Sequence, residues 1–400
     1  MYKRQLIDLV IKTESQKGGG IDKATVGDDI LKDLLAIAGH GHALFRSVSL
    51  TLRPNDYLSY VFGSMIEGSD ANEFYTGGKS QPVPLGDLYA GDKVSKLQLL
   101  ENKWLLGLDL PTPKVEGDAA KPGSTAATAV YKDFDGSLFI DGVRPTEVNQ
   151  GGLGDCYFVS SLLLIARGAP EFLADAVVDN GVINGKQTWG IRFFDQYGTP
   201  LWVTVDKQLP VISASNSKLL GTSSSTGELW IPIFEKAYTQ ANEIGLFGRE
   251  DTDNAYYAIE GGQGDTLLAL TNANITVYQD FPYDQPSTVR SVFVDTKSKA
   301  KVEAAAKEIM AVLNAGGFAW IGCDRDAFDK SGKQTFVGGH AMAVFDYAPS
   351  DPNNTTVYVY NPWGVSANGD SYSSPFVVDI VTLVGGSQGL DLWLTNPILN

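Results

Sequence analysis

The stretch Asn149-Gln-Gly-Gly-Leu-Gly-Asp-Cys-Tyr-Phe158 decides the fold. It begins as a loop rich in glycine, and Cys156 then opens an apolar run that continues to Ala166. Apolar residues recur at helical spacing within this run, at Phe158, Leu162, Ile165 and Ala166. The pattern predicts a buried helix with Asp155 as its N-cap and an end at Gly168.

This prediction places Cys156 in the first turn of a helix. Free backbone N–H groups and the helix dipole favour the thiolate over the thiol at that position. Two other interpretations stay open, because a free cysteine is most often a small buried hydrophobe and a glycine loop can bind an anion. The loop lacks the Gly-Lys-Ser/Thr ending of a nucleotide-binding loop. A reactive thiol therefore requires a base and an orienting group elsewhere in the chain.

The composition is that of an ordinary globular chain. Its 400 residues suffice for two or three compact units, with 43% hydrophobic and 20% charged residues. The 31 basic and 47 acidic residues give a net charge of −16, which argues against nucleic acid and anionic membranes as partners. Two cysteines cannot form a disulfide framework, and Cys323 is predicted to be a buried strand residue without a role.

No stretch of the sequence indicates a membrane span or a cleaved leader. The apolar runs are shorter than a bilayer requires. The start Met1-Tyr-Lys-Arg4 is basic, but Asp8 and Lys12 interrupt the apolar residues that follow, so we expect no signal peptide. This favours a cytoplasmic location and leaves export without a signal open.

Residues 1–120 are predicted to form a mostly helical N-terminal region. Its predicted helices are Leu6–Ile11, Ile30–Ile37 and Val94–Leu106, the last with Trp104 facing a core. His40 and His42 are interpreted as a helix end and loop, because two histidines are too few ligands for a metal site. A linker rich in Gly, Ala, Ser and Thr is predicted near residues 111–128.

From Tyr131 onward, the pattern changes to alternating strands and helices. Strands are predicted over Ser137–Val143 and in a hairpin of Thr188–Phe194 with Leu201–Val205. Amphipathic helices are predicted over Glu228–Asn242 and Val302–Leu313, and strands dominate beyond them.

His340 is the candidate base, because the other two histidines lie in the N-terminal region. It begins a predicted strand that ends at Tyr347, and a second strand follows over Thr355–Asn361. A hairpin register that pairs Tyr347 with Asn354 places the His340 and Asn361 side chains opposite each other on one face. An isolated histidine is more often structural than catalytic, so its role depends on these neighbours.

A cysteine, a histidine and an asparagine can together form a nucleophile, its base and a group that orients the base. The imidazole takes the thiol proton, and the amide holds the ring in one orientation and tautomer. Trp363 is predicted either to shield the His340–Asn361 bond from water or simply to pack in the core. Gln150 is predicted either to stabilise an oxyanion with the Cys156 backbone N–H or to bond to its own loop.

These motifs resemble those of the calpain family of papain-like cysteine proteases. Gln150–Cys156 resembles the family's nucleophile motif, Gly339-His-Ala341 its histidine motif and Asn361-Pro-Trp-Gly364 its asparagine motif. Phe234–Tyr238 and Ala258–Gly262 are similar to two further family segments, and the glycines of the second line the substrate cleft. The resemblance covers about residues 131–395, in the family's order.

The resemblance implies an α+β fold with a papain-like core of two subdomains. A mainly helical subdomain, residues 129–264, would carry the cysteine, and a mainly antiparallel sheet, residues 265–400, the histidine and asparagine. It implies a cysteine endopeptidase that acts on proteins or peptides through a thioester acyl-enzyme. It also implies substrate contacts, which we assign to Gly154, Gly261, Gly262, Gly339 and Trp363.

Calcium brings the two subdomains together in the animal members of the family. Three residues align with ligands of the first calcium site: Ile140, Gly142 and Glu147. The acidic partner expected after Gly198 is missing, and Val365-Ser-Ala367 replaces the acidic residues of the second site. No EF-hand loop occurs in the sequence. We therefore expect that no cofactor is required, or that calcium binds at one weak site.

Two departures from the family pattern lie near the expected cleft. Tyr157 replaces the tryptophan after the nucleophile, and Glu260 replaces a serine, which would disfavour acidic substrate residues. Two other functions stay open: a peptide-binding module, which would have lost a catalytic residue, and an acyl-transferase or deamidase, which would keep them all. The N-terminal region is interpreted as a propeptide, a targeting module or a scaffold.

Overall fold

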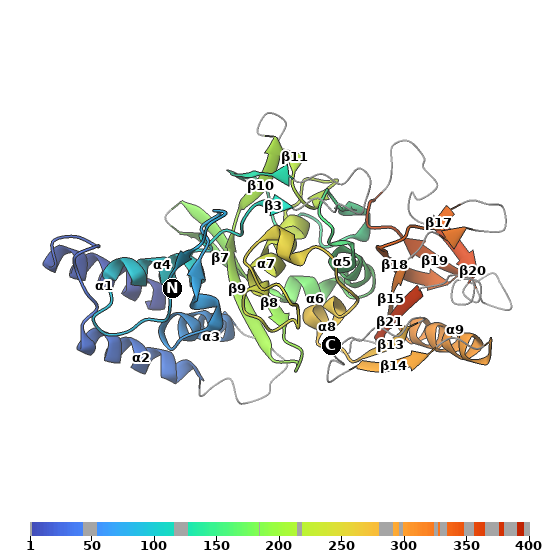
Figure 1. Ribbon diagram of the computed structural model, residues 1–400, viewed down its shortest axis with the longest axis horizontal. Coiled ribbons are helices and arrows are strands. Elements are labelled where there is room, and N and C mark those ends of the chain that lie inside the picture. Colours follow the sequence, from blue (N-terminus) through green and yellow to red (C-terminus); the bar gives the residue numbers. More distant parts are fainter. Residues whose placement is uncertain are drawn as a thin grey trace.

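A computed structural model gives the fold of most of the chain. It describes residues 2–42, 54–115, 127–183, 185–213, 218–279, 291–295, 299–323, 327–328, 334–347, 356–364, 376–379 and 390–395. The molecule is elongated, with the N-terminal helices at one end and the C-terminal strands at the other (Figure 1). Separate helical and sheet regions confirm the α+β class that the sequence predicts.

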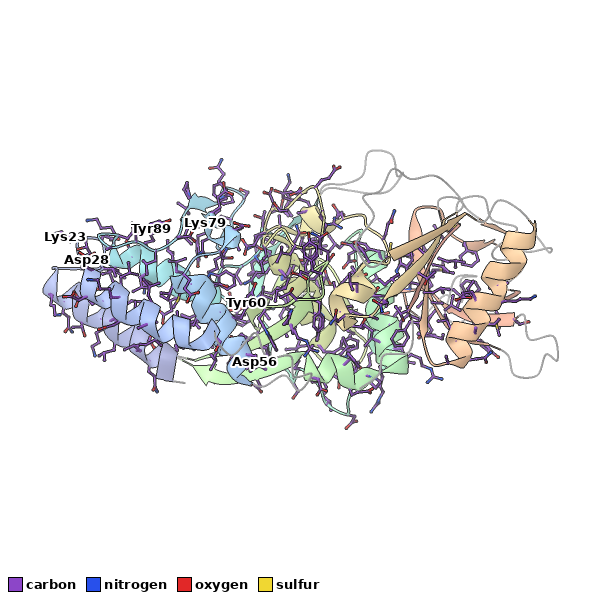
Figure 2. The ribbon with its side chains drawn as sticks, turned by 90° about the horizontal axis from the view of Figure 1, so that it is seen from below. Lys23, Asp28, Asp56, Tyr60, Lys79 and Tyr89 are labelled. Atoms are coloured by element: carbon purple, nitrogen blue, oxygen red, sulfur yellow. The ribbon has the colours of Figure 1, made fainter. Side chains whose placement is uncertain are left out.

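The N-terminal region is mostly helical. Its elements are α1 (Tyr2–Lys17), α2 (Asp28–His42), α3 (Pro54–Ile66), η1 (Asp70–Asn72), β1 (Phe74–Tyr75), β2 (Val83–Pro84) and α4 (Val94–Trp104). The three predicted helices are confirmed, and Trp104 is buried as expected. Figure 2 shows Tyr60 of α3 close to the central part of the molecule, whereas Lys23 and Asp28 lie at the far end. No helix in the described part of the chain is both long and apolar enough to cross a membrane.

The central part combines helices with small sheets. Its helices are η2 (Pro145–Glu147), α5 (Cys156–Gly168), α6 (Pro170–Asp175), α7 (Trp230–Asn242), η3 (Tyr256–Ile259) and α8 (Thr266–Thr271). Its strands are β3 (Lys114–Val115), β4 (Ala127–Thr128), β5 (Val130–Asp133), β6 (Val148–Asn149), β7 (Val177–Ile183), β8 (Lys186–Phe194), β9 (Pro200–Asp206), β10 (Gln208–Ser213), β11 (Lys218–Leu219) and β12 (Ser223–Ser224). The antiparallel hairpin of β8 and β9 confirms the prediction. Most of the predicted linker lies outside the described residues.

Two predictions for the central part are wrong. The segment 137–143 forms no strand, because its backbone groups bond instead to the start of α7 and to the Glu228 carboxylate. Helix α7 confirms the helix predicted over Glu228–Asn242, but its polar face is not exposed to solvent, since all of its residues are buried. Several of its polar side chains bond to other buried groups: Lys236 Nζ, for example, lies 2.5 Å from Asp206 Oδ1. Periodicity shows where the apolar side chains lie but not whether water covers the others.

The C-terminal part is built on one seven-stranded sheet. Its strand order is β14 (Ser291–Asp295), β13 (Ile275–Gln279), β21 (Leu390–Thr395), β15 (Phe318–Cys323), β18 (His340–Tyr347), β19 (Thr356–Tyr360) and β20 (Phe376–Asp379). All neighbouring strands are antiparallel except β13 and β14. Helix α9 (Lys299–Asn314) confirms its prediction and packs on this sheet, and β16 (Ala327–Phe328) pairs with β17 (Gln334–Phe336). Cys323 is buried at the end of β15, as predicted.

Helix α5 packs directly on the C-terminal sheet, against β15 and β18. The Trp320 indole N–H donates to the Tyr157 carbonyl at 3.0 Å. Gly168 allows close packing, because a Cβ there would lie 2.3 Å from the Phe318 ring. This contact brings the N-terminus of α5 to the start of β18. The predicted subdomain boundary at residue 264 stays a prediction.

The N-terminal region is joined to the central part by buried polar contacts. The Tyr57 hydroxyl of α3 hydrogen-bonds Thr204 of β9 at 2.7 Å, and its ring covers Gly190, where a Cβ would lie 2.5 Å away. Thr112 donates its N–H to the Asn254 carbonyl at 2.8 Å and accepts from the Tyr256 N–H at 3.2 Å. The N-terminal region therefore packs directly against the central part of the fold.

A buried cluster of charged side chains also joins the N-terminal region to the central part. Lys103 Nζ of α4 lies 2.6 Å from Asp109 Oδ2 and 2.7 Å from Glu243 Oε2. The lysine and Asp109 side chains are 1% and 0% exposed, so water cannot replace either partner. Burial raises the pKa of Glu243 to about 8.

We predict that Lys103→Met destabilises the protein by about 3–5 kcal/mol, because two buried carboxyls lose their cation. Urea denaturation of both variants and the wild type measures the effect. The matched control is Lys186→Met, whose Asp133 ion pair is exposed to solvent, so its cost stays below about 1 kcal/mol. Equal losses in the two variants would contradict a junction held by the buried cluster.

Candidate active site

Cys156 is the first residue of α5 and is half-buried. Asp155 occupies the N-cap position, but its side chain makes no capping hydrogen bond, which corrects the expected cap. The Cys156 Sγ accepts a hydrogen bond from the Ala341 N–H at 3.4 Å. The sulfur therefore lies beside the residue that follows His340, at the start of β18.

His340 and Asn361 meet as the sequence predicts. His340 Nε2 lies 2.8 Å from Asn361 Oδ1, and both side chains are buried. The Trp363 N–H also donates to Asn361 Oδ1, at 3.1 Å, which fixes this atom as an acceptor. His340 Nε2 must then carry the hydrogen, so Nδ1 of the neutral ring keeps its lone pair.

The predicted hairpin register is wrong. Tyr347 pairs with Val357 instead of Asn354, and the register shifts between Val344 and Asp346. The turn predicted over 348–354 lies outside the described residues. Asn361 follows the last residue of β19, so it reaches His340 from a loop and not as a cross-strand neighbour. The two side chains meet for a different geometric reason from the one expected.

Trp363 covers the His340 ring. The two ring centroids are 4.4 Å apart with an angle of 29° between the planes. The tryptophan is 44% exposed, so its other side faces solvent. It thus shields one face of the imidazole, as predicted.

The cysteine loop and the asparagine loop are in direct contact. The Gln150 N–H donates to the Pro362 carbonyl at 2.8 Å. Gly364 has φ +79, and a Cβ there would lie 2.0 Å from Asn149 Oδ1, so only glycine fits. Backbone contacts therefore hold the loop before Cys156 against the loop after Asn361.

The Gln150 side chain is turned into its own loop. Its Nε2 donates to the Leu153 carbonyl at 2.9 Å and to Asp155 Oδ1 at 3.4 Å. This is the second of the two interpretations made from the sequence. In this conformation, both hydrogens of the Gln150 amide bond to the loop before Cys156, so neither points to a substrate.

The predicted cleft glycines lie near the two ends of the site: Gly261 and Gly262 contact the loop before Cys156 and the start of α5, and Gly339 precedes His340. The Gly261 N–H donates to the Gly154 carbonyl at 2.9 Å, and Gly261 has φ +72. A Cβ on Gly262 would lie 2.5 Å from the Tyr157 ring, so this glycine is required for packing. Gly339 has φ +64 and forms the turn that starts β18, where its N–H bonds to Cys323.

Two buried carboxyls lie beneath the nucleophile loop. Burial, and then the nearby charge of Glu235, raise the pKa of Asp155 well above its ordinary value. Burial raises the pKa of Glu235 to about 7, although Thr222 donates two hydrogen bonds to it. Asp155 Oδ2 and Glu235 Oε1 have no partner, so a proton on one carboxyl is the natural way to satisfy them. Sequence reasoning missed this pair, which has no local pattern.

The calcium candidates lie together but do not form an oxygen cage. Glu228 Oε1 accepts from the Ile140 N–H at 2.5 Å, so N–H groups of this loop face the carboxylate. Glu147 accepts from the Trp230 indole at 3.0 Å, and burial and a hydrogen bond to Glu228 raise its pKa. The Gly142 backbone has φ +89. Among the described residues, no group of three or more acidic, histidine or cysteine side chains is placed to hold a metal. Sequence reasoning missed Glu228, which directly precedes the apolar start of α7.

We predict that Glu235→Gln flattens the pH dependence of stability. The folded pKa of about 7 exceeds the ordinary 4.5, so the wild type loses stability as the pH rises between these values. Glutamine stays neutral and removes this loss, which is at most about 3 kcal/mol. Urea denaturation across this range measures the slope. Exposed Glu171→Gln is the control, and parallel curves for Glu235→Gln and the wild type would contradict a buried proton.

Comparison with known proteins identifies the fold family. A profile described as "Calpain family cysteine protease" matches residues 127–375. The relatives include calpain-5 of Mus musculus, 30% identical over 56% of this chain and 33% of that protein. The calpain-2 catalytic subunit of Homo sapiens is 26% identical over 58% and 29%, and a calpain of Schistosoma mansoni is 24% identical over 57% and 27%.

The chain spans a third or less of the length of these relatives. The profile match nevertheless covers more than half of this chain and includes Cys156, His340 and Asn361. The resemblance seen in the motifs is thereby confirmed, and the chain belongs to the calpain family of cysteine proteases.

Proposed function

We propose that the protein is a cysteine endopeptidase that uses Cys156, His340 and Asn361. The observation that carries this proposal is the hydrogen bond of His340 Nε2 to Asn361, with the Cys156 sulfur at the adjacent residue. Asn361 occupies Nε2, which leaves Nδ1 as the basic nitrogen for the thiol.

In the proposed acylation step, His340 Nδ1 takes the proton of the Cys156 thiol. The thiolate then attacks the carbonyl carbon of the substrate peptide bond, and a tetrahedral oxyanion forms. The imidazolium returns the proton to the leaving amine as the C–N bond breaks, which leaves a thioester on the sulfur. His340 next takes a proton from water, and the hydroxide attacks the thioester carbonyl. The C–S bond then breaks and releases the acid, and the proton on His340 returns to the Cys156 sulfur.

Asn361 is proposed to hold the imidazole throughout this sequence. Its carbonyl oxygen accepts from Nε2 in both the neutral and the protonated ring, so one tautomer serves both steps. Trp363 keeps water from this hydrogen bond, which strengthens it because the local dielectric is low.

The oxyanion is proposed to bind the backbone N–H of Cys156 and the side-chain amide of Gln150. Both amide hydrogens of Gln150 bond within the loop, so the proposal requires one of these hydrogen bonds to break and form again with the oxyanion. The 3.4 Å bond to Asp155 is the longer of the two and is the one we expect the oxyanion to replace.

Protein or peptide substrates are proposed to lie extended past Gly261 and Gly262 on one side and Trp363 on the other. No cofactor takes part in the proposed chemistry. The cytoplasmic location and the exclusion of nucleic acid stay predictions from the sequence.

We predict that the wild type gains one adduct from an epoxide thiol inhibitor and cuts casein, whereas Cys156→Ala does neither. Intact-mass spectrometry and peptide analysis measure both outcomes. Cys323→Ala is the control, because it removes the other, buried cysteine; we expect it to keep the adduct on Cys156 and the cleavage of casein. An unmodified wild-type thiol, with casein left whole, would contradict the proposal.

The same experiment separates the other functions that keep these residues. Hydrolysis of a peptide bond adds one water to the two products together, whereas acyl transfer joins the acyl fragment to an amine acceptor in place of water. His340→Ala is expected to lower the rate more than about a thousandfold, and Asn361→Ala less, because its imidazole is only misoriented.

We predict that activity does not require calcium. Calcium titration of casein cleavage and of tryptophan fluorescence, against a chelator, measures the requirement. The physical reason is that N–H groups and the Trp230 indole already use the Glu228 and Glu147 carboxylates. The prediction is wrong if both signals of the wild type respond steeply to micromolar calcium and Glu147→Gln no longer responds. That result would show that the contacts of Glu147 and Glu228 rearrange around the ion.

A further inference from the structure

Tyr157 links the nucleophile helix to the neighbouring cleft segment, defined here as residues 258–262. Its side chain is fully buried next to Cys156. The hydroxyl donates to the Ile259 carbonyl at 3.0 Å and accepts from Arg249 Nη1 at 2.9 Å. An indole at this position would have only a donor and could not accept from arginine. Tyrosine in place of the family's tryptophan therefore makes a bridge that the usual residue cannot make.

Arg249 binds the same segment through its backbone. Its Nε and Nη2 donate to the Ala258 carbonyl at 3.2 and 2.8 Å, and Nη2 also reaches the Glu260 carbonyl at 3.4 Å. The guanidinium carbon lies 5.5 Å from the centre of the Tyr157 ring. The planar guanidinium fork thus fixes two carbonyls of the cleft segment and the tyrosine hydroxyl at once.

Two glycines fasten the other end of the cleft segment. Gly262 packs on the Tyr157 ring, and the Gly261 N–H bonds to Gly154, two residues before the nucleophile. The Tyr157 carbonyl accepts from Trp320 of β15, which ties this network to the C-terminal sheet. The position of the cleft segment relative to the sulfur therefore depends on Tyr157 and Arg249.

We propose that Tyr157 and Arg249 are positioning residues that hold the cleft segment at the distance from Cys156 at which a peptide reacts. This rests on the proposed function, because the segment binds substrate only if the protein is a peptidase. Neither residue touches the reacting atoms. They act through the carbonyls of residues 258–260 and through the ring that supports Gly262.

Tyr157→Phe tests the proposal with the loss of one hydroxyl. Tyr57→Phe is the matched control, because Tyr57 is equally buried and its hydroxyl also has two partners, Thr204 and Asn180, far from the cleft. Two reagents report on Cys156: iodoacetamide, which needs no cleft, and a peptidyl epoxide, which does. We expect Tyr157→Phe to slow the peptidyl reagent and to lower kcat/KM by about tenfold. Its iodoacetamide rate and all rates of Tyr57→Phe stay unchanged.

Arg249→Lys gives a second test, because lysine keeps the charge but lacks the planar fork that spans the two carbonyls and the hydroxyl. It should also lower the peptidyl rate and spare the iodoacetamide rate. Equal effects on both reagents, or equal losses in Tyr57→Phe, would overturn the proposal, since they indicate a general loss of structure.

Hydrogen exchange separates a failure of this proposal from a failure of the proposed function. In Tyr157→Phe, the Gly261 amide should exchange faster than in the wild type, and Tyr57→Phe should leave it unchanged. If the wild type reacts with neither reagent, the peptidase assignment fails and exchange still tests the positioning. Unchanged exchange at Gly261 in Tyr157→Phe overturns the positioning role.

Discussion

The arrangement of reactive groups depends on the carbonyl oxygen of Asn361. This one atom accepts hydrogen bonds from the His340 ring and from the Trp363 N–H. The backbone donor fixes the orientation of the amide, and the amide fixes the tautomer of the ring. Because Asn361 is fully buried, rotation of its side chain would leave buried donors without an acceptor.

The contact between the two sides of the site is made by backbone. The Gln150 N–H bonds to Pro362, Ala341 donates to Cys156, and Gly364 leaves room for Asn149. Helix α5 adds a broad apolar contact on the C-terminal sheet. Glycine in the asparagine motif thus has a geometric reason, which is the close approach of two loops from distant parts of the chain.

The sequence predicted the residues of the site better than their geometry. The contact of His340 with Asn361 was predictable because few residue types can serve as a base for a thiol and only three histidines were available. The hairpin register was wrong because a bulge after Val344 and a loop position for Asn361 leave no periodic signal. Glu228 and Arg249 escaped notice since each bonds to backbone far along the chain. The sequence around Glu228 and Arg249 shows no pattern except a charged residue near apolar ones.

The contacts of Thr112 have a consequence for how the family region is delimited. The match to the family begins at residue 127, yet Thr112 pairs with the chain at Asn254 and Tyr256, a few residues before the cleft segment. A fragment cut at the edge of the match would lose this pairing and uncover the face of β9 on which α3 packs. Similarity thus marks the region shared with the family, whereas the packed unit also includes the helices outside the match.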